Sequence, residues 1–469
     1  MRAPHAPALE AERLSPYLAF LFALLSTATL FDGFDAAMMS LASADVRATL
    51  DISRGEWSTV YGVYKIGVVL SFVFLLSADR FGRRSLMMVT VAGFTIFTGL
   101  TALARDAWEF TVCQLLARIF LTAEYALAII MVGEEFPARF RGRAIAVLTS
   151  LATVGVLAIA KLQPFILLED GAAGNWLHDA GAAAVAWLQR AAGRPVDGAD
   201  WRILYLFGVA PLVLVAGLRV GMRETRRFEA AQAAAAQRPA AGLLANALLP
   251  WRPEYRRRTA IVALLWNCVY MVTSPAVAYW VIYAREDLGF SPHTVGDVIF
   301  WAYVAGVGGH VAAGWAIDRF GRRNTCAASY VLAAITLVGL FHTQSMLGQY
   351  VWHISTVFCF LAATTATHVY ASELFPTEIR ATGYGWASNF FGRVTEIATP
   401  LLVGLFVDRL GIPWSVTTVA FGPILGAILV LRFAPETRGM TLEQIQEALG
   451  APQPAAARAA EPVQAPVSG

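Results

Sequence analysis

The chain has 469 residues, of which 57% are hydrophobic and only 15% are charged, and its formal net charge at pH 7 is +3. A soluble globular domain carries about 25% charged residues, so this composition excludes an ordinary soluble protein and predicts an integral membrane protein. The four cysteines lie in apolar stretches without paired spacing, which argues against a disulfide or metal framework.

Twelve apolar segments are long enough to cross a bilayer. About 20 mostly apolar residues span the hydrocarbon layer as a helix, and helices are expected because a spanning backbone must satisfy its own hydrogen bonds. The predicted spans are 17–43, 57–78, 85–105, 108–132, 144–168, 202–221, 259–284, 293–317, 325–343, 350–374, 381–407 and 413–433.

The distribution of arginine predicts how these spans are oriented. Connectors on the side that holds both termini carry most of the arginines, including the run RPEYRRR at 252–258. Because such residues favour the cytoplasmic side, we expect a multi-pass protein of the inner (plasma) membrane with both termini in the cytoplasm. The long connector 169–201 is then external, and we expect a short interfacial helix within it.

Two motifs occur twice at a single offset. DRFGRR occupies 79–84 and 318–323, and EEFPARFR at 134–141 corresponds to ELFPTEIR at 373–380, an offset of 239 in both cases. This repeat predicts two homologous six-helix halves, as in many secondary transporters. The predicted division is an N-terminal half at 1–221, a cytoplasmic linker at 222–258, a C-terminal half at 259–433 and a disordered cytoplasmic tail at 434–469.

The repeated motifs resemble those of the major facilitator superfamily. ELFPTEIRATGYG and PETRGMTLEQI are similar to its sugar-porter-like branch, whereas DGFD at 32–35 and NFFGR at 389–393 resemble aromatic-acid/proton symporters. The resemblance implies an all-α integral membrane fold of twelve transmembrane helices in two pseudo-symmetric six-helix bundles. The glutamine-rich pattern of sugar porters is absent from 263–280, and Leu75 stands where the first signature has glycine.

Charges at the predicted cytoplasmic helix ends suggest a gate. By this resemblance, pairs between acids and arginines of these motifs would latch the inner ends of the two halves in the outward-open state. The alternative is that the arginines only hold the loops in the cytoplasm. The gating candidates are Asp79, Arg83, Glu134, Arg141, Asp318, Arg322, Glu373 and Arg380.

Eight charges lie well inside the predicted spans, where ionisable residues are costly and are functional-site candidates by default. They break the repeat: at the offset of 239, Asp32 corresponds to Met271 and Arg118 to Val357. A scaffold is expected to repeat, whereas a site for one asymmetric substrate is not. These eight residues are Asp32, Asp35, Lys65, Arg118, Glu124, Lys161, Arg393 and Glu396.

The leading hypothesis is a proton-coupled symporter of a small organic carboxylate, with aromatic carboxylates included. Asp32 or Asp35 would carry the proton beside Arg118 or Lys65, and Arg393 would hold the substrate's carboxylate. Two purely structural alternatives stay open. Arg393 and Glu396 could serve only to neutralise each other, and Lys161 could extend its ammonium group to the membrane surface. The substrate-binding candidates are Arg393, Glu396, Asn389, Lys65 and Glu124.

Other function classes remain as alternatives. A carrier of a neutral or cationic metabolite, such as a sugar or an organic cation, would use Asp32 or Asp35 to bind its substrate directly, and a non-transporting sensor is a further possibility. The chain shows no nucleophile motif, phosphate loop or metal-ligand spacing. We therefore expect no enzymatic activity, cofactor, metal or nucleic-acid partner, and we expect a monomer whose partners are substrate, proton and lipid bilayer.

Overall fold

The computed structural model describes residues 15–72, 74, 81–136, 138–168, 174–219, 221–224, 248–375, 380–440 and 444–445, and their regular structure is helical. The N-terminal half contributes α1 (Pro16–Leu41), α2 (Ser43–Leu50), α3 (Arg54–Leu70), α5 (Arg83–Thr101), α6 (Ala107–Glu135), α7 (Ala138–Leu162), η1 (Gln163–Phe165), α8 (Trp176–Ala191) and α9 (Trp201–Arg219). The C-terminal half contributes η2 (Leu249–Trp251), α12 (Arg256–Ala278), α13 (Trp280–Ile282), η3 (Tyr283–Asp287), α14 (Pro292–Phe320), α15 (Arg322–His342), α16 (Met346–Leu374), α17 (Arg380–Tyr384), η4 (Gly385–Phe390), η5 (Phe391–Arg393) and α18 (Val394–Phe433).

Among the described residues, eight helices are long and apolar enough to cross a membrane. One of these, Thr382–Phe433, contains the last two predicted spans. They are separated inside α18 at Gly411, whose φ of 72° is a conformation that favours glycine, and Pro413 follows it. The remaining predicted spans correspond to α3, α7 and α9. The prediction of an all-α, twelve-helix membrane fold is therefore consistent with the structure.

Local sequence moves two of the predicted boundaries. Ser53 and Glu56 form a capping box, so α3 begins at Arg54 rather than at residue 57. The first predicted span ends early, at Leu41, because the chain turns at Ala42 and continues as the short helix α2.

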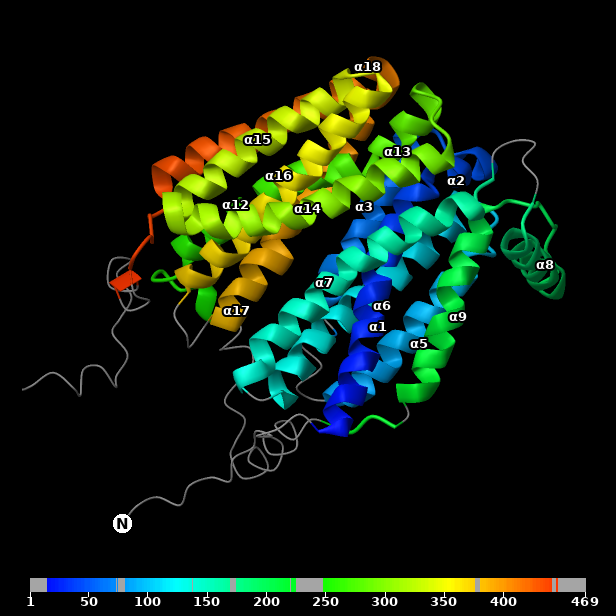
Figure 1. The fold of residues 1–469 in the computed structure, drawn as a ribbon, viewed down its shortest axis with the longest axis horizontal. Helices are drawn as coiled ribbons and strands as arrows, with labels where there is room; N and C mark the ends of the chain where they lie inside the picture. Colours follow the sequence, from blue (N-terminus) through cyan, green and yellow to red (C-terminus); the bar gives the residue numbers. More distant parts are fainter. Residues whose placement is uncertain are drawn as a thin grey trace, which may run out of the picture.

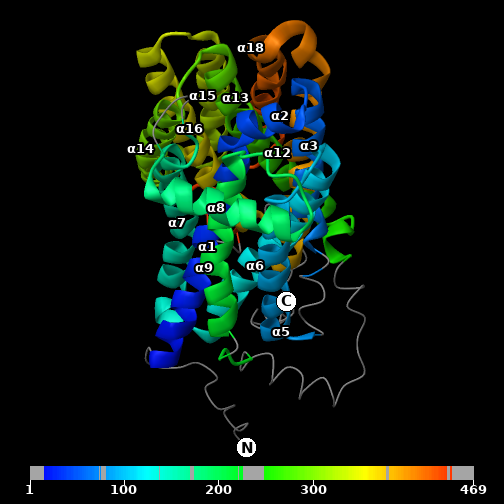
Figure 2. The ribbon, with the colours of Figure 1, turned by 90° about the vertical axis from the view of Figure 1, so that its right-hand side faces the viewer.

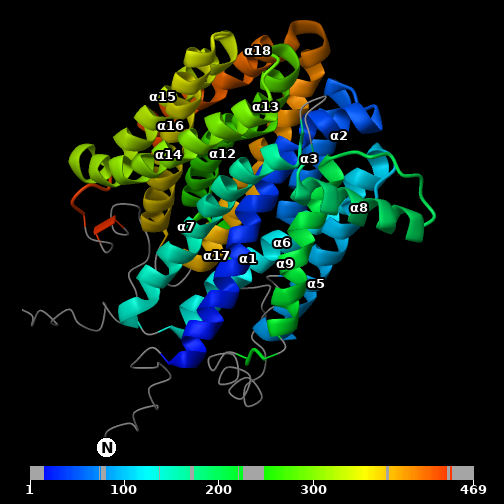
Figure 3. The same cartoon turned by 45° about the vertical axis from the view of Figure 1, so that its right-hand side comes forward.

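Each half packs mainly within itself, and the two halves meet along two helix pairs. In the N-terminal half α1 packs on α7 and α5 on α6, and in the C-terminal half α14 packs on α16 and α12 on α18. The halves are joined by α3 against α18 and by α7 against α14. Figures 1 and 3 show the halves side by side, close together near α2 and α13 and farther apart near α17 and the start of α1.

We name the end of the bundle at α2 and α13 the distal end, and the end at the starts of α5 and α15 the terminal end. The terminal end carries a device that the repeat duplicates. Glu224 accepts hydrogen bonds from the first-turn amides of α5, and Glu436 accepts one from the Arg322 amide of α15 at 2.9 Å. A carboxylate at a helix N-terminus is favourable because it neutralises exposed amides and the positive end of the helix dipole.

A glycine makes this cap possible in each half. Gly82 and Gly321 precede α5 and α15 with φ values of 87° and 91°. A Cβ atom at Gly321 would lie 2.5 Å from a carboxylate oxygen of Glu436. The glycine of the repeated DRFGRR motif therefore gives both the backbone conformation and the room that the capping carboxylate needs.

The distal end is closed by ion pairs between the halves, which we call the distal clasp: Asp45, Arg47, Arg54, Arg285, Glu286 and Asp287. Arg285 binds Asp45 through two bonds of 3.1 Å, and Arg54 binds Asp287 at 2.7 Å and Glu286 at 3.0 Å. Arg47 also pairs with Glu286, its equivalent in the repeat. Repeat-equivalent positions meet here, and opposite charges make the contact attractive.

A further ion pair crosses between the halves beside the clasp. Lys161 of α7 pairs with Asp297 of α14. Lys161 therefore has a specific partner in the other half, which answers the alternative that it only extends to the membrane surface.

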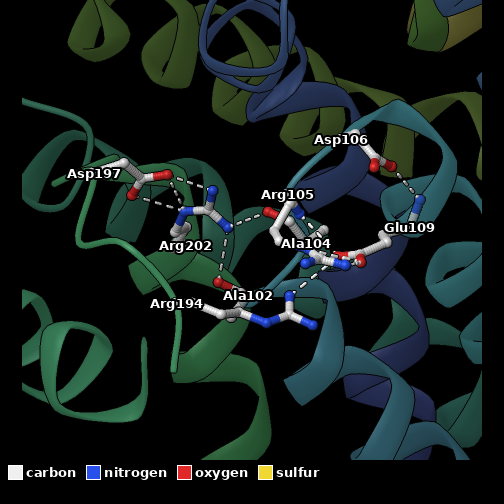
Figure 4. A network of polar contacts seen from close by, with 8 residues as sticks. All are labelled: Ala102, Ala104, Arg105, Asp106, Glu109, Arg194, Asp197 and Arg202. Atoms are coloured by element: carbon white, nitrogen blue, oxygen red, sulfur yellow. Dashed lines mark hydrogen bonds and ion pairs between the residues drawn. The ribbon is translucent and has the colours of Figure 1, made fainter. Parts of the chain in front are cut away.

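The distal connector contains the expected short helix, α8, which lies across the bundle in Figure 2. A polar network anchors the connector after this helix (Figure 4). Arg202 binds Asp197 at 2.9 Å and the Ala102 and Ala104 carbonyls at 3.0 and 2.7 Å. Nearby, Arg194 binds Glu109 at 3.1 Å. Burial raises the pKa of Asp197, but hydrogen bonds from Arg202 and Gln189 outweigh it and hold that pKa below its usual value.

The clasp predicts a charge-swap result. Asp45→Arg or Arg285→Asp alone places like charges opposite each other and should weaken distal closure, whereas the double variant should restore it. A partly exposed pair contributes about 0.2–1 kcal/mol, so we expect a cysteine placed at Val277 to react about two- to fivefold faster with an impermeant maleimide from the distal side in each single variant. The native cysteines are replaced in all variants. Equal reactivity in the single variants and the parent would exclude a gating role for this pair.

Candidate functional site

A cavity of about 210 Å³ lies between the two halves. Its walls are mainly apolar and aromatic, and Lys65 and Glu396 are its charged lining residues. The aromatic residues come from both halves: Tyr61 from α3, and Trp280, Tyr303, His353 and Phe360 from the C-terminal half. Trp280 packs against the His353 ring at 4.0 Å between centroids. Such a cavity suits a flat, apolar ligand that carries a charged group.

The helix that supplies Glu396 is irregular just before the cavity. Residues 385–393 form the π-helical turn η4 and the 3-10 turn η5 instead of continuing α17 into α18. Asn267 of α12 satisfies polar groups there, because it donates to the Phe391 carbonyl at 2.9 Å and accepts from the Thr395 amide at 2.8 Å. Irregular backbone at membrane depth is tolerated where protein buries it, and this break positions Arg393 and Glu396.

Glu396 joins two of the predicted site residues. Lys65 Nζ donates to Glu396 Oε1 at 2.8 Å, and Arg393 donates to Glu396 Oε2 at 2.6 Å. Lys65 belongs to the N-terminal half and Arg393 to the C-terminal half. The predicted neutralisation of Arg393 by Glu396 is therefore present, and Lys65 is a second partner that spacing along the helix did not indicate.

The two aspartates of the DGFD motif have different surroundings. Asp32 pairs with Arg118 at 3.3 Å, as the sequence hypothesis proposed. Asp35 is 2% exposed, and among the described residues its carboxylate oxygens have no hydrogen-bond partner within 3.5 Å, although the Tyr64 side chain is close enough to interact with it. The charged and titratable groups that face it are Asp32 on its own helix, Tyr64 and Lys65 on α3, Arg118 on α6 and Tyr205 on α9.

Three of the five substrate-binding candidates do not line the cavity, namely Arg393, which adjoins it through Glu396, and Glu124 and Asn389. Glu124 is buried in α6, pairs with Arg219 at the end of α9 and accepts a hydrogen bond from Thr90. Its environment in this structure is an internal ion pair of the N-terminal half, and its role in substrate binding stays a prediction. Asn389 lies in η4 and is not among the residues that line the cavity.

The gating candidates are described only in part. Asp79 lies outside the described residues, and so do the side chains of Glu134, Arg141 and Arg380. Arg83 begins α5, and its amide donates to Glu224 at 3.0 Å. Arg322 binds Glu373 at 3.0 Å and lies 3.7 Å from Asp318, all within the C-terminal half. A latch between the halves would form in a different conformation, and it stays a prediction.

Sequence reasoning missed several residues that shape the site. Arg219 is a fully buried cation at the end of α9 that the sequence analysis did not single out. Asn267 lies far in sequence from Phe391 and Thr395, and the two sides of the distal clasp are also far apart along the chain. No spacing rule links residues so far apart. The two glutamate caps could have been found from the sequence, because the tripeptide ETR occurs at 224–226 and again at 436–438.

Helices long and apolar enough to cross a membrane, two packed halves and a central cavity between them are typical of a membrane transporter. Comparison with known proteins agrees. The profile of the Major Facilitator Superfamily matches residues 25–283 and 268–459, so the chain belongs to this superfamily and is a multi-pass membrane protein.

Known members are similar over most of the chain. The gallate transporter of Pseudomonas putida is 25% identical, over 89% of this chain and 92% of its own length. The niacin transporter NiaP of Acinetobacter baylyi is 23% identical, over 89% of this chain and 93% of its own. The crystal structure of a D-xylose-proton symporter superposes with a TM-score of 0.69 and 18% identity, covering 91% of this chain and all of that one, which shows the shared fold.

The position of Glu124 predicts a stability effect without an effect on substrate choice. Glu124→Gln leaves the charge of Arg219 buried without its carboxylate, which costs about 3–5 kcal/mol. Thermal unfolding followed by size-exclusion chromatography should show a lower midpoint for this variant. Glu254→Gln, the same change at an exposed position, should stay within about 0.5 kcal/mol of the parent. A changed substrate preference with unchanged stability would return Glu124 to the site.

Proposed function

We propose that this protein is a proton-coupled symporter of a small organic carboxylate, with aromatic carboxylates as the favoured class, and that it works by alternating access in the plasma membrane. The observation that carries the proposal is the cavity between the halves, which combines aromatic walls with Lys65 and Glu396. A lysine cation attracts a carboxylate, and aromatic rings stack favourably on a flat ring.

Counting the charges around the cavity supports an anionic substrate. The cations are Arg118, Lys65 and Arg393, and the carboxylates that pair with them are Asp32 and Glu396. An ionised carboxylate without hydrogen bonds is costly to bury, so we infer that Asp35 holds a proton in this conformation. The cluster then has one positive charge in excess, which one substrate carboxylate would neutralise. A proton and an organic anion would thus bind together.

The names of similar proteins point to the same substrate class. Gallate and niacin are both carboxylic acids with an aromatic ring, and transporters of each are similar to this chain. The shared fold with a xylose symporter does not favour a sugar here, because the identity is only 18%. A neutral or cationic substrate remains the alternative and is separated from the proposal by the charge of the solute that is accumulated.

The distal clasp suggests which state of the transport cycle the structure represents. It closes the distal end through Asp45–Arg285 and Arg54–Asp287. If arginine in the terminal-end loops marks the cytoplasm, both termini are cytoplasmic and this is an inward-facing state. The motif residues Asp318, Arg322 and Glu373 would then latch the terminal end when the protein faces outward.

An uptake assay with matched solutes tests the substrate class. Proteoliposomes are given benzoate, nicotinate or gallate, and in parallel benzamide or nicotinamide, which keep the ring but lack the charge. With an inward proton gradient, we expect accumulation of at least one carboxylate well above its amide, and a collapse of that accumulation when the gradient is dissipated. Accumulation of an amide with no uptake of any carboxylate would reject the proposal.

Replacing each aspartate tests the coupling. Asp35→Asn keeps the shape but removes the titrating group, so it should abolish accumulation driven by the proton gradient while sparing exchange of labelled for unlabelled substrate. Asp32→Asn leaves Arg118 without its carboxylate and should impair both. The two variants share chemistry and helix, so each is a control for the other. If Asp35→Asn still concentrates substrate under a proton gradient, Asp35 is not the coupling residue.

A further inference from the structure

Glu396 is the only carboxylate among the described residues that lines the cavity, and it binds two cations at once. Each of its oxygens serves one of them, Oε1 accepting from Lys65 and Oε2 from Arg393. All three side chains are largely buried, with exposed fractions of 11% for Lys65, 21% for Arg393 and 7% for Glu396. Two buried cations therefore share one carboxylate. The three groups carry one positive charge in excess, which a second anion could neutralise.

The two cations differ in how firmly Glu396 can keep them. Arg393 is three residues away on the same chain segment, lies over the Tyr270 ring at 4.8 Å and is not among the residues that line the cavity. Lys65 comes from the other half, lines the cavity and lies 5.2 Å from the Tyr61 ring and 5.5 Å from the Tyr64 ring. A ligand entering the cavity can reach Lys65 without disturbing Arg393.

We propose that Glu396 occupies, in the empty transporter, the place of the substrate's carboxylate on Lys65, and that the bound carboxylate displaces it. This inference rests on the proposed function, because it requires a carboxylate substrate. After the exchange Glu396 keeps Arg393, the substrate neutralises Lys65, and no buried charge is left unpaired. Lys65, rather than Arg393 as the sequence hypothesis had it, is then the direct ligand of the substrate's carboxylate.

The exchange also links substrate binding to the movement of the halves. The Lys65–Glu396 bond joins α3 to α18 across the boundary between the halves. Its opening removes one direct bond between the halves and replaces it with a contact through the substrate. Tyr61 and Tyr64 would hold the ammonium group in place during the exchange through cation–π attraction.

Removing the internal competitor tests the proposal. Glu396→Gln keeps the size of the side chain but no longer competes as an anion, so the purified protein should bind a carboxylate more tightly. We expect the Kd for benzoate, nicotinate or gallate, whichever the parent binds most tightly, to fall about tenfold, equivalent to about 1.4 kcal/mol. The Kd for the corresponding amide should not change. Glu109→Gln, the same change in the distal network, should leave both Kd values as in the parent.

Lys65→Gln gives an independent test, because Glu396 keeps Arg393 in that variant and no buried carboxylate is left without a cation. It should lose the preference for carboxylate over amide while still binding the amide. An unchanged or weaker carboxylate affinity in folded Glu396→Gln, or a retained carboxylate preference in Lys65→Gln, would overturn the exchange and leave the proposed function standing. If the parent itself binds none of the carboxylates, the proposed function fails, and the exchange with it.

Discussion

A charge inside a membrane protein must have a partner, because removing an ion from water costs several kcal/mol that only opposite charge and hydrogen bonds offset. The described structure around the cavity follows from this constraint. Arg118 binds Asp32, and Lys65 and Arg393 bind Glu396. Asp35, for which the described part of the chain offers no ion-pair partner, is the group best placed to exist as a neutral acid. Because an unpaired charge is costly here, the binding of a proton or of an anionic ligand changes how strongly each of these residues holds its partner.

The internal repeat separates scaffold from site. The glutamate caps on α5 and α15 and their glycines recur in both halves, since both halves need the same helix starts. The charges near the cavity do not recur. The distal clasp shares features of both the repeated scaffold and the unrepeated site. Arg47 and Glu286 are at equivalent positions of the repeat and contact each other, and two like charges there would repel. Because the two equivalent positions carry opposite charges, this pseudo-symmetric contact is attractive.

Much of the fold was predictable from sequence, because span length and apolar content are local properties. The family, the helical membrane fold and transport rather than catalysis are confirmed. It was harder to predict which residues contact each other in the folded chain. The Arg393–Glu396 pair follows from a spacing of three residues, but Lys65 binds Glu396 across 331 residues and Arg219 binds Glu124 from another helix. Helical periodicity gives the face of a residue, not the helix it meets, so the pairing of Glu124 with Arg219 could not be predicted.

The cavity's chemistry suggests why one proton and one carboxylate would travel together. With Asp35 ionised, the carboxylates Asp32, Asp35 and Glu396 balance the cations Arg118, Lys65 and Arg393, and an additional anion would be repelled. With Asp35 neutral, one cation is in excess and an anion is attracted. Lys65 lines the cavity and lies within electrostatic range of Asp35, so we infer that protonation in the N-terminal half acts on ligand affinity through Lys65. Coupling then needs no movement of Asp35 itself, only a change in how strongly Lys65 is held by the carboxylates around it.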